Sequence, residues 1–222
     1  MFCIPIIAKN TDEALEKITR ANTLADMVEI RLDVMDTFDL HEIIQAACKP
    51  VLVTYRSREE GGKGSADPET RTDYILTAIQ EGADLVDVEL SLPPKWQERI
   101  FDARGRSGIV ISTHISDSTP SGRELEKIFR DLANTGADII KIVTWAKTWA
   151  DNLRVLQLIP KAHNLEAKVI AFCMGPMGRI SRIVSHLMGG YLTFASLEGG
   201  EESAGGQIPI RQMKEIIDML KT

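Results

Sequence analysis

The sequence predicts a (β/α)8 barrel, also called a TIM barrel, formed as a single domain by residues 1–222. Eight short apolar segments alternate with eight segments of helical length, which is typical of βα repeats around a parallel sheet. A frame of residues also recurs at intervals close to two such repeats. Neither a linker nor a low-complexity tract divides the chain, and 222 residues suffice for one barrel at the short end of the size range of that fold.

Three of the apolar segments share a frame in which Ala-Asp is followed by two apolar residues, a charge and an apolar residue. The copies start at positions 25, 83 and 137, so they lie 58 and 54 residues apart. Half of that spacing, roughly 28 residues, is close to the length of one strand–helix unit. The three segments are therefore expected to be alternate strands, with Glu29, Asp87 and Lys141 facing inward in equivalent registers.

The eight expected strands are short and rich in valine and isoleucine, as parallel strands buried on both faces are. They span residues 2–7, 27–32, 50–55, 84–89, 108–113, 138–143, 168–173 and 192–196. A doubly wound open sheet is the rival architecture, but it would have fewer strands and a glycine-rich turn after the first one. The first strand instead runs into Ala8-Lys9-Asn10-Thr11, which lacks such a turn.

Helices are expected between the strands and after the last one. They span residues 11–23, 39–47, 68–81, 94–103, 121–135, 149–163, 177–188 and 209–220. Asp67 before Pro68 is a typical helix start, and Pro209 opens the last helix in the same way. Gly82 and Gly136 are placed to end helices.

The composition excludes several classes of protein. The net charge of −6 argues against broad nucleic-acid binding, which needs a basic surface. No apolar run reaches the ~18 residues of a membrane span, and the first residues lack the basic segment of a secretory signal. Cys3, Cys48 and Cys173 form no spaced pair, so reduced thiols in a cytoplasmic protein are expected.

Motifs for metals and phosphates are missing from the sequence. It contains no His-x-x-x-His pair, no Cys-x-x-Cys pair, no calcium loop and no Walker-type phosphate loop. We therefore expect no metal and no cofactor, and a small molecule as the only ligand. Exposed and interfacial helix faces look alike in this sequence, which allows a homodimer without defining the oligomeric state.

Lys141 lies inside the apolar run that forms the sixth expected strand. A bare ammonium group is costly to bury, so two explanations stay open. Lys141 either forms a structural ion pair with Glu29 or Asp87, or it supplies a neutral amine that attacks a carbonyl to form a Schiff base. In the second case, burial and nearby arginines would favour the neutral amine.

His114 ends the fifth expected strand. It is either a hydrogen-bonded histidine at a strand end or a general acid and base, because imidazole titrates near neutral pH. The other histidines, His41, His163 and His186, fall on expected helices and are assigned to the surface or to packing. Trp145 and Trp149 are likewise assigned to packing.

Three segments that follow expected strands contain groups suited to an anionic substrate. Arg56 directly follows the third strand, at the end of the barrel where active sites lie. Arg182 is near the start of the seventh helix, where an arginine can fork onto a carboxylate. The segment 198–207 contains four glycines and offers hydrogen bonds from Ser203 and Gln207. A mobile lid is the preferred interpretation of that segment, and a plain connector is the alternative.

Taken together, these residues resemble the type I 3-dehydroquinate dehydratase family of the shikimate pathway, across essentially the whole chain. The resemblance rests on the joint order of Glu29-Ile30-Arg31, Arg56 to Gly62, His114, Ala137 to Lys141, Ile180-Ser181-Arg182 and Ser203 to Gln207. The usual fold of that family is a (β/α)8 barrel, in agreement with the strand count. The implied activity is a carbon–oxygen lyase reaction, the elimination of water from 3-dehydroquinate to give 3-dehydroshikimate.

The resemblance also implies a role for each site residue. Lys141 would form the imine, His114 would transfer the protons, and Glu60 would orient His114. The substrate carboxylate would be held by Arg182, Ser203 and Gln207, and the ring hydroxyls by Glu29, Arg31 and Arg56.

One departure from the family pattern concerns the barrel floor. Many members start with a hairpin that plugs it, whereas this sequence begins directly at its first expected strand. The floor is therefore expected to be closed in another way or to be left more open.

Two other functions remain as alternatives. A class I aldolase-type lyase also uses an imine on a barrel lysine but cleaves a carbon–carbon bond. A non-catalytic binding barrel would use Lys141 only as an ion-pair partner.

Overall fold

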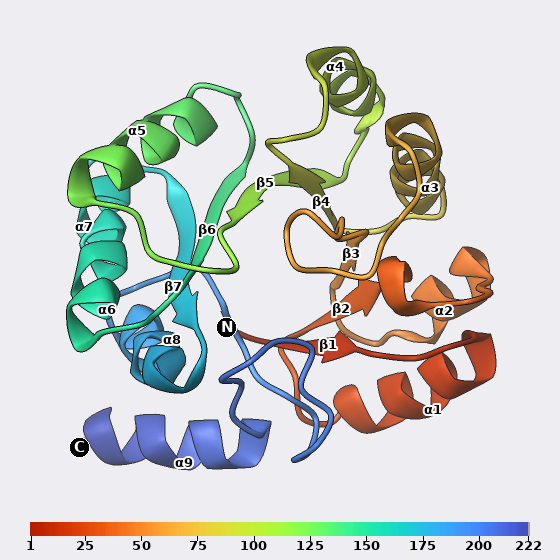
Figure 1. The fold of residues 1–222 in the computed structure, drawn as a ribbon. Coiled ribbons are helices and arrows are strands. Elements are labelled where there is room, and N and C mark those ends of the chain that lie inside the picture. The colour runs from red at the N-terminus through yellow and green to blue at the C-terminus, as the bar shows by residue number, and fades with distance from the viewer. Residues whose placement is uncertain (222) are drawn as a thin grey trace.

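Eight parallel strands form a ring that is surrounded by helices (Figure 1). The computed structural model describes residues 1–221. The strands are β1 (Phe2–Ile6), β2 (Met27–Arg31), β3 (Val51–Thr54), β4 (Leu85–Glu89), β5 (Gly108–His114), β6 (Ile139–Trp145), β7 (Lys168–Met174) and β8 (Thr193–Phe194). Each overlaps one of the strands expected from the sequence, so the predicted (β/α)8 barrel is confirmed.

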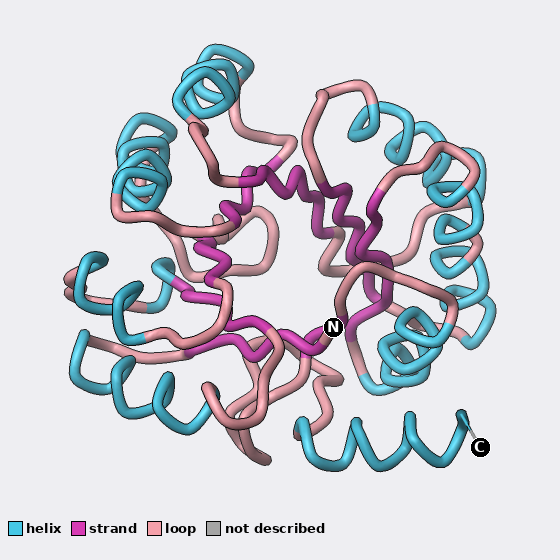
Figure 2. Tube along the Cα trace, turned by 180° about the vertical axis from the view of Figure 1, so that it is seen from behind, coloured by secondary structure: helices cyan, strands magenta, loops and turns pink. Residues whose placement is uncertain are grey.

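The helices lie outside the ring of strands, as the view from behind shows (Figure 2). They are α1 (Thr11–Ala21), α2 (Leu40–Ala46), α3 (Pro68–Gln80), α4 (Pro94–Ala103), α5 (Gly122–Ala133), α6 (Trp149–Leu156), α7 (Leu158–His163), α8 (Arg179–Leu187) and α9 (Ile210–Lys221), with two 3-10 turns, η1 (Leu32–Val34) and η2 (Pro176–Gly178). Asp67 caps α3 by accepting from two backbone N–H groups, and Pro68 is its first residue, as expected. Within residues 1–221, no helix combines the length and the apolar character required to cross a bilayer.

The single helix expected over residues 149–163 is wrong, because the structure divides it into α6 and α7. Pro160 explains the break. In a continuous helix its missing N–H would leave the carbonyl of Leu156 without a partner, and its ring would press against that carbonyl. The first helix therefore ends at Leu156.

The ring of strands has one weak seam. Backbone ladders join the strands in the order β7-β6-β5-β4-β3-β2-β1-β8, so β7 and β8 are the two edges. Between these edges, the backbone N–H of Tyr191 donates to the carbonyl of Val169 at 2.8 Å. The strand expected over 192–196 is shorter than predicted, at Thr193–Phe194.

Side chains of the strands themselves close the barrel floor. Inward-facing residues at the amino ends of the strands form a buried apolar cluster inside the ring, separate from the core between strands and helices. The layer of this cluster nearest the floor contains Met27, Leu85, Ile139 and Leu192. The next layer towards the site contains Cys3, Leu52, Val110 and Ile170. This apolar filling closes the floor of the ring and leaves the polar site above it.

The recurring Ala-Asp frame fixes the register of alternate strands. In each copy, the Asp carboxylate accepts a hydrogen bond from a backbone N–H at the start of the preceding strand. The pairs are Phe2 N–Asp26, Val51 N–Asp84 and Ile109 N–Asp138, each at 2.8 Å. Because side chains alternate along a strand, the residue three positions after each Asp faces the barrel interior. Those residues are Glu29, Asp87 and Lys141, so the frame brings three charges into one layer.

Candidate active site

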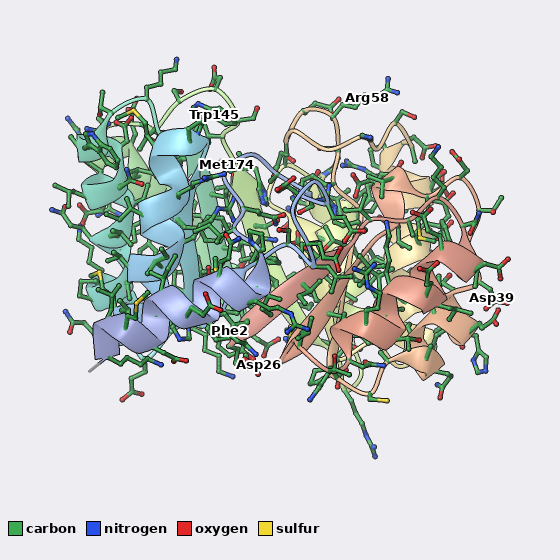
Figure 3. All side chains as sticks on the ribbon, turned by 90° about the horizontal axis from the view of Figure 1, so that it is seen from below. Phe2, Asp26, Asp39, Arg58, Trp145 and Met174 are labelled. Carbon is green, nitrogen blue, oxygen red and sulfur yellow. The ribbon has the colours of Figure 1, made fainter. Side chains whose placement is uncertain are left out.

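A cavity of about 480 Å³ opens at the carboxyl ends of the strands. Figure 3 shows Trp145, Met174 and Arg58 at this end of the barrel, and Phe2 and Asp26 at the opposite end. All the site residues expected from the sequence line the cavity: Glu29, Arg31, Arg56, Glu60, His114, Lys141, Arg182, Ser203 and Gln207. These residues belong to several strands and loops that are far apart in the sequence. The ring arrangement of the strands brings them together.

Lys141 lies at the base of this cavity with its side chain almost completely buried. Its Nζ is 2.9 Å from Oδ2 of Asp87 and 3.7 Å from Oε1 of Glu29, and it lies 4.7 Å from the centre of the Phe194 ring. The ion pair that the sequence left open is therefore present. The nearest charged partners of the amine are carboxylates and not the arginines that we expected.

The ion pair and the imine chemistry are compatible. An iminium carries one positive charge at the position that the ammonium occupied, so a carboxylate that pairs with the ammonium also stabilises the iminium. Asp87 is well suited to this because it stays ionised. Burial alone would raise its pKa, but Arg56 and Lys141 outweigh burial and hold the pKa of Asp87 well below its ordinary value.

Arg56 holds the buried carboxylates of the site in place. Its Nη2 donates to Asp87 at 2.6 Å, and its Nη1 lies within 3.1 Å of Glu60, Glu89 and Ser112. Burial tends to lower the pKa of this guanidinium, and its three carboxylate neighbours raise the pKa overall. Arg56 therefore already has partners on both terminal nitrogens, although it also lines the cavity.

Glu29 and Arg31 project from β2 towards the cavity, one layer apart. Glu29 accepts a hydrogen bond from the hydroxyl of Thr54 at 2.9 Å. Arg31 forms a two-pronged pair with Asp33, at 2.8 and 2.9 Å. Burial favours a higher pKa for Asp33, but the pairing with Arg31 overrides it and lowers that pKa.

His114 and Glu60 form a pair on the wall of the cavity. A single oxygen of Glu60 lies 3.0 Å from the backbone N of His114 and 3.2 Å from its ring Nδ1. Burial, with help from Arg56 and Lys141, lowers the pKa of His114 well below its ordinary value, so the imidazole is neutral at pH 7. Within residues 1–221 its Nε2 makes no hydrogen bond, which leaves that nitrogen available to a substrate.

Glu60 is close to half protonated at neutral pH. Burial, opposed by Arg56 and reinforced by Glu89 and Asp87, raises its pKa to about 7. Glu60 can therefore exchange a proton near neutral pH, whereas the imidazole of His114 beside it stays neutral.

Among residues 1–221, Arg182 is the cation of the site with no carboxylate beside it. It is 1% exposed, its Nε has no hydrogen-bond partner in this described part of the chain, and its Nη2 donates to the carbonyl of Gly205 at 3.3 Å. Burial lowers the pKa of Arg182 to about 9. Its guanidinium lies 4.5 Å from the centre of the Phe172 ring, which supports it from one face.

Residues 195–209, which we call loop 8, cover the cavity next to Arg182. Ser203 and Gln207 bond to one another: the Ser203 backbone N donates to Gln207 Oε1 at 2.8 Å, and Gln207 Nε2 donates to Ser203 Oγ at 2.9 Å. The backbone N of Gly175 donates to the carbonyl of Gly205 at 3.0 Å, which joins loop 8 to the end of β7.

Of the two tryptophans assigned to packing, only Trp145 fits that assignment. A Cβ built on Gly175 would lie 2.8 Å from the Trp145 ring, and one built on Gly205 would lie 3.3 Å from it, so Gly175 after β7 and Gly205 of loop 8 both lie close against this ring. The assignment is wrong for Trp149, which is 63% exposed on α6.

Sequence reasoning missed several residues that line the cavity. Thr54, Phe172 and Phe194 were not assigned to the site, although each lies on an expected strand, and Met174 directly follows the strand expected over 168–173. Alternation along the strands could have found Phe172, because Ile170, Phe172 and Met174 share the inward face of β7.

A (β/α)8 barrel with a buried lysine amine, a neutral histidine and an unpaired arginine around one cavity defines an imine-forming lyase. The comparisons agree with this class. The family model for type I 3-dehydroquinase matches residues 2–222, and the chain therefore belongs to the type I 3-dehydroquinase family. The reaction of this family is the carbon–oxygen lyase step of the shikimate pathway that removes water from 3-dehydroquinate.

Individual relatives support the same assignment. The 3-dehydroquinate dehydratase of Thermococcus onnurineus is 36% identical over 217 residues, covering 97% of this chain and 96% of that protein. The bifunctional 3-dehydroquinate dehydratase/shikimate dehydrogenase of Arabidopsis thaliana is 36% identical over 222 residues, but this chain spans only 36% of its length. A crystal structure of the Clostridium difficile type I enzyme, with covalently modified comenic acid, has a TM-score of 0.89 and 25% identity, covering 99% of this chain and 91% of that one. These comparisons do not favour the aldolase-type alternative.

Proposed function

We propose that this protein dehydrates 3-dehydroquinate to 3-dehydroshikimate through an imine between the substrate ketone and Lys141. The main observation behind the proposal is the amine of Lys141, which lies at the base of the cavity with carboxylates beside it. A β-hydroxyketone loses water only after a proton leaves the carbon next to the carbonyl. A neutral ketone makes that proton too weakly acidic for an imidazole, whereas an iminium supplies an electron sink.

The first step joins the amine to the ketone. The ammonium of Lys141 releases one proton, and the neutral amine attacks the carbonyl carbon to give a carbinolamine. The released proton returns to the carbinolamine hydroxyl, which leaves as water and gives the iminium. Asp87 and Glu29 then face a cation that cannot leave the site, and Arg56 keeps Asp87 in position. The protein supplies the electron sink from its own side chain, so the reaction requires no separate cofactor.

The second step is the elimination. Ser112 pairs with Lys141 across the β5–β6 ladder, and His114 is two residues further along β5. At about 3.3 Å per residue, His114 therefore lies about 7 Å further toward the cavity mouth, which leaves room for a substrate ring. Nε2 of neutral His114 removes the proton next to the iminium carbon. The resulting imidazolium then protonates the leaving hydroxyl, and hydrolysis of the iminium frees Lys141.

Glu60 orients the ring of His114 and stabilises its protonated form during this cycle. It accepts from the backbone N–H of His114 and lies within hydrogen-bond distance of the ring Nδ1, and these two contacts fix the ring orientation. Once the imidazole carries a proton, the carboxylate of Glu60 stabilises the positive charge. Removal of the substrate proton and its return to the hydroxyl can thus be performed by one residue.

Arg182, with Ser203 and Gln207, is proposed to bind the substrate carboxylate, because its buried guanidinium has no anion beside it. Glu29, Arg31 and Arg56 are proposed to contact the ring hydroxyls. Within this group, Glu29 and Arg31 are placed to act directly, and Arg56 acts also through the carboxylates that it holds.

We expect Arg182→Ala to weaken substrate binding far more than turnover. Truncating one partner of a buried charge pair costs at least about 2 kcal/mol, so KM should rise by roughly 30-fold or more. Steady-state kinetics check this, with Arg179→Ala on the same helix as the control because Arg179 does not line the cavity. An unchanged KM in Arg182→Ala would remove its role as carboxylate anchor.

The activity itself is tested by incubating the purified protein with 3-dehydroquinate. Formation of the conjugated enone gives a rising ultraviolet absorbance. A class I aldolase-type lyase would release an aldehyde instead, and a binding barrel would produce neither signal. No enone from a folded protein would overturn the proposed function.

We also infer that the whole chain, residues 1–222, acts as one catalytic unit, because the cavity takes residues from β2 through to loop 8. The cytoplasmic location, the homodimer and the absence of nucleic-acid partners stay as predictions from the sequence.

A further inference from the structure

Loop 8 has an inner side that faces the substrate and an outer side that faces α1. Ser203, Ala204 and Gln207 line the cavity from the inner side. In Figure 1, the blue segment between β8 and α9 lies beside the red helix α1. A substrate in this cavity would lie against the inner side of the loop, so whatever fastens the loop to α1 affects how these residues meet the substrate.

Two ion pairs join the outer side of loop 8 to α1. Glu198 pairs with Arg20, and Oε1 of Glu201 lies 3.7 Å from Nζ of Lys17. Both basic residues face the loop from successive turns of α1. The other carboxylate oxygen of Glu201 is buried and finds no hydrogen-bond partner among the residues that the structure describes.

Lys17 is held more firmly than an ordinary surface lysine. Its Nζ donates to the carbonyl of Ile7 at 2.6 Å and to Glu13 at 2.8 Å, and its side chain is only 19% exposed. Glu13 in turn accepts from the backbone N of Lys9 at 2.8 Å. Lys17 is thus fixed in place by the segment after β1 and by its own helix, and it offers loop 8 a pre-positioned positive charge.

The charge of loop 8 makes such a partner necessary. The loop carries three glutamates, at 198, 201 and 202, and it lies over the cavity that is proposed to hold a substrate carboxylate beside Arg182. Without countercharge, closing the loop over an anion would be opposed by repulsion between like charges. The two α1 cations neutralise two of the three glutamates.

We propose that Lys17 and Arg20 of α1, acting through Glu201 and Glu198, are positioning residues that fasten loop 8 and so place Ser203 and Gln207 against the substrate. The inference rests on the proposed function for its effect on substrate, and on geometry alone for its effect on the loop. Lys17 and Arg20 lie outside the cavity lining and take no part in the chemistry.

The kinetic test compares Lys17→Met and Glu201→Gln with matched controls at low ionic strength. Each variant should raise KM about three- to tenfold and leave kcat within about twofold. The reason is that loss of a partly exposed ion pair such as Lys17–Glu201 lowers affinity by up to about tenfold. The control for Glu201→Gln is Glu202→Gln, since Glu202 belongs to the same loop but bonds only within it, to Gly200. The control for Lys17→Met is Lys127→Met, whose lysine pairs within α5. Both controls should keep the KM of the parent protein.

A double-mutant cycle shows whether the two residues act through one another. The Lys17→Met/Glu201→Gln protein should have the KM of either single variant, and not the product of both effects. Its KM should also depend less on salt than that of the parent protein, since the screened pair is gone. A parent-like KM in both single variants, or strictly multiplicative effects, would overturn the proposal.

A second measurement keeps the inference separate from the proposed function. Cleavage by a glutamate-specific protease within loop 8 should be about three- to tenfold faster in Lys17→Met than in Lys127→Met, with no substrate present. Equal cleavage rates would contradict the fastening of loop 8 by Lys17, even if the protein is an active dehydratase. Faster cleavage without any enone formation would support this fastening and reject the proposed function.

Discussion

Lys141→Ala is expected to abolish turnover, with kcat lower by a factor of at least about 10⁴, because no other group in the cavity can form the imine. Lys141→Arg should fail equally, although it keeps a positive charge beside Asp87, since a guanidinium does not act as the nucleophile. Borohydride reduction in the presence of 3-dehydroquinate should attach substrate to the peptide that contains Lys141 in the parent protein only. Mass spectrometry of the digested protein reads out the adduct.

The folding state of these variants needs its own control. Lys141→Ala removes the cation beside Glu29 and leaves Asp87 with Arg56 alone, and breaking a buried ion pair costs about 3–5 kcal/mol. Thermal unfolding should therefore show a lower Tm for Lys141→Ala than for Lys141→Arg. Loss of activity in a folded Lys141→Arg protein then reports on chemistry and not on stability. Substantial turnover in either variant would reject the imine route.

His114→Ala is the second change with a large expected effect. It should lower kcat by about 10²–10⁴, the range for losing a general acid and base, while the imine on Lys141 still forms. Borohydride should therefore trap the adduct in this variant as it does in the parent protein. A folded His114→Ala protein with no trapped adduct would contradict the division of labour between the two residues.

The pH dependence of His114 has a definite sign. Burial lowers its pKa well below the ordinary value, so the neutral base persists on the acid side of pH 6.5 and is lost only at lower pH. The same shift affects stability, because the unfolded chain binds a proton at about pH 6.5 that the folded protein does not. The contribution of His114 to stability is present above that pH and falls as the pH drops from about 6.5 towards the folded pKa.

Much of the fold was predictable from the sequence because its signals are local. Apolar runs define the strands, and the Ala-Asp frame sets the register that turns Glu29, Asp87 and Lys141 inward. The break before α7 was missed even though its cause, Pro160, is in the sequence. The short β8 was missed because its length depends on how the ring closes, which no single segment determines.

The membership of the site was also predictable, but its internal pairing was not. Strand ends converge in a barrel whatever their partners are, so the lining residues follow from the fold class. Which carboxylate approaches Lys141 depends on distances between residues 54 positions apart. In the same way, the sequence could not distinguish Arg56 from Arg182. Arg56 pairs with three carboxylates, whereas Arg182 pairs with no carboxylate among residues 1–221.

The seam between β7 and β8 gives the two halves of the site different stiffness. Lys141 and His114 belong to β6 and β5, which are paired along their lengths on both sides, whereas loop 8 follows a two-residue strand at the edge of the ladder. The reacting amine and imidazole are thus mounted on the most rigid part of the barrel. Ser203 and Gln207, two of the groups proposed to hold the substrate carboxylate, are mounted on its most yielding part, so exchange of ligands need not disturb the alignment on which bond making depends.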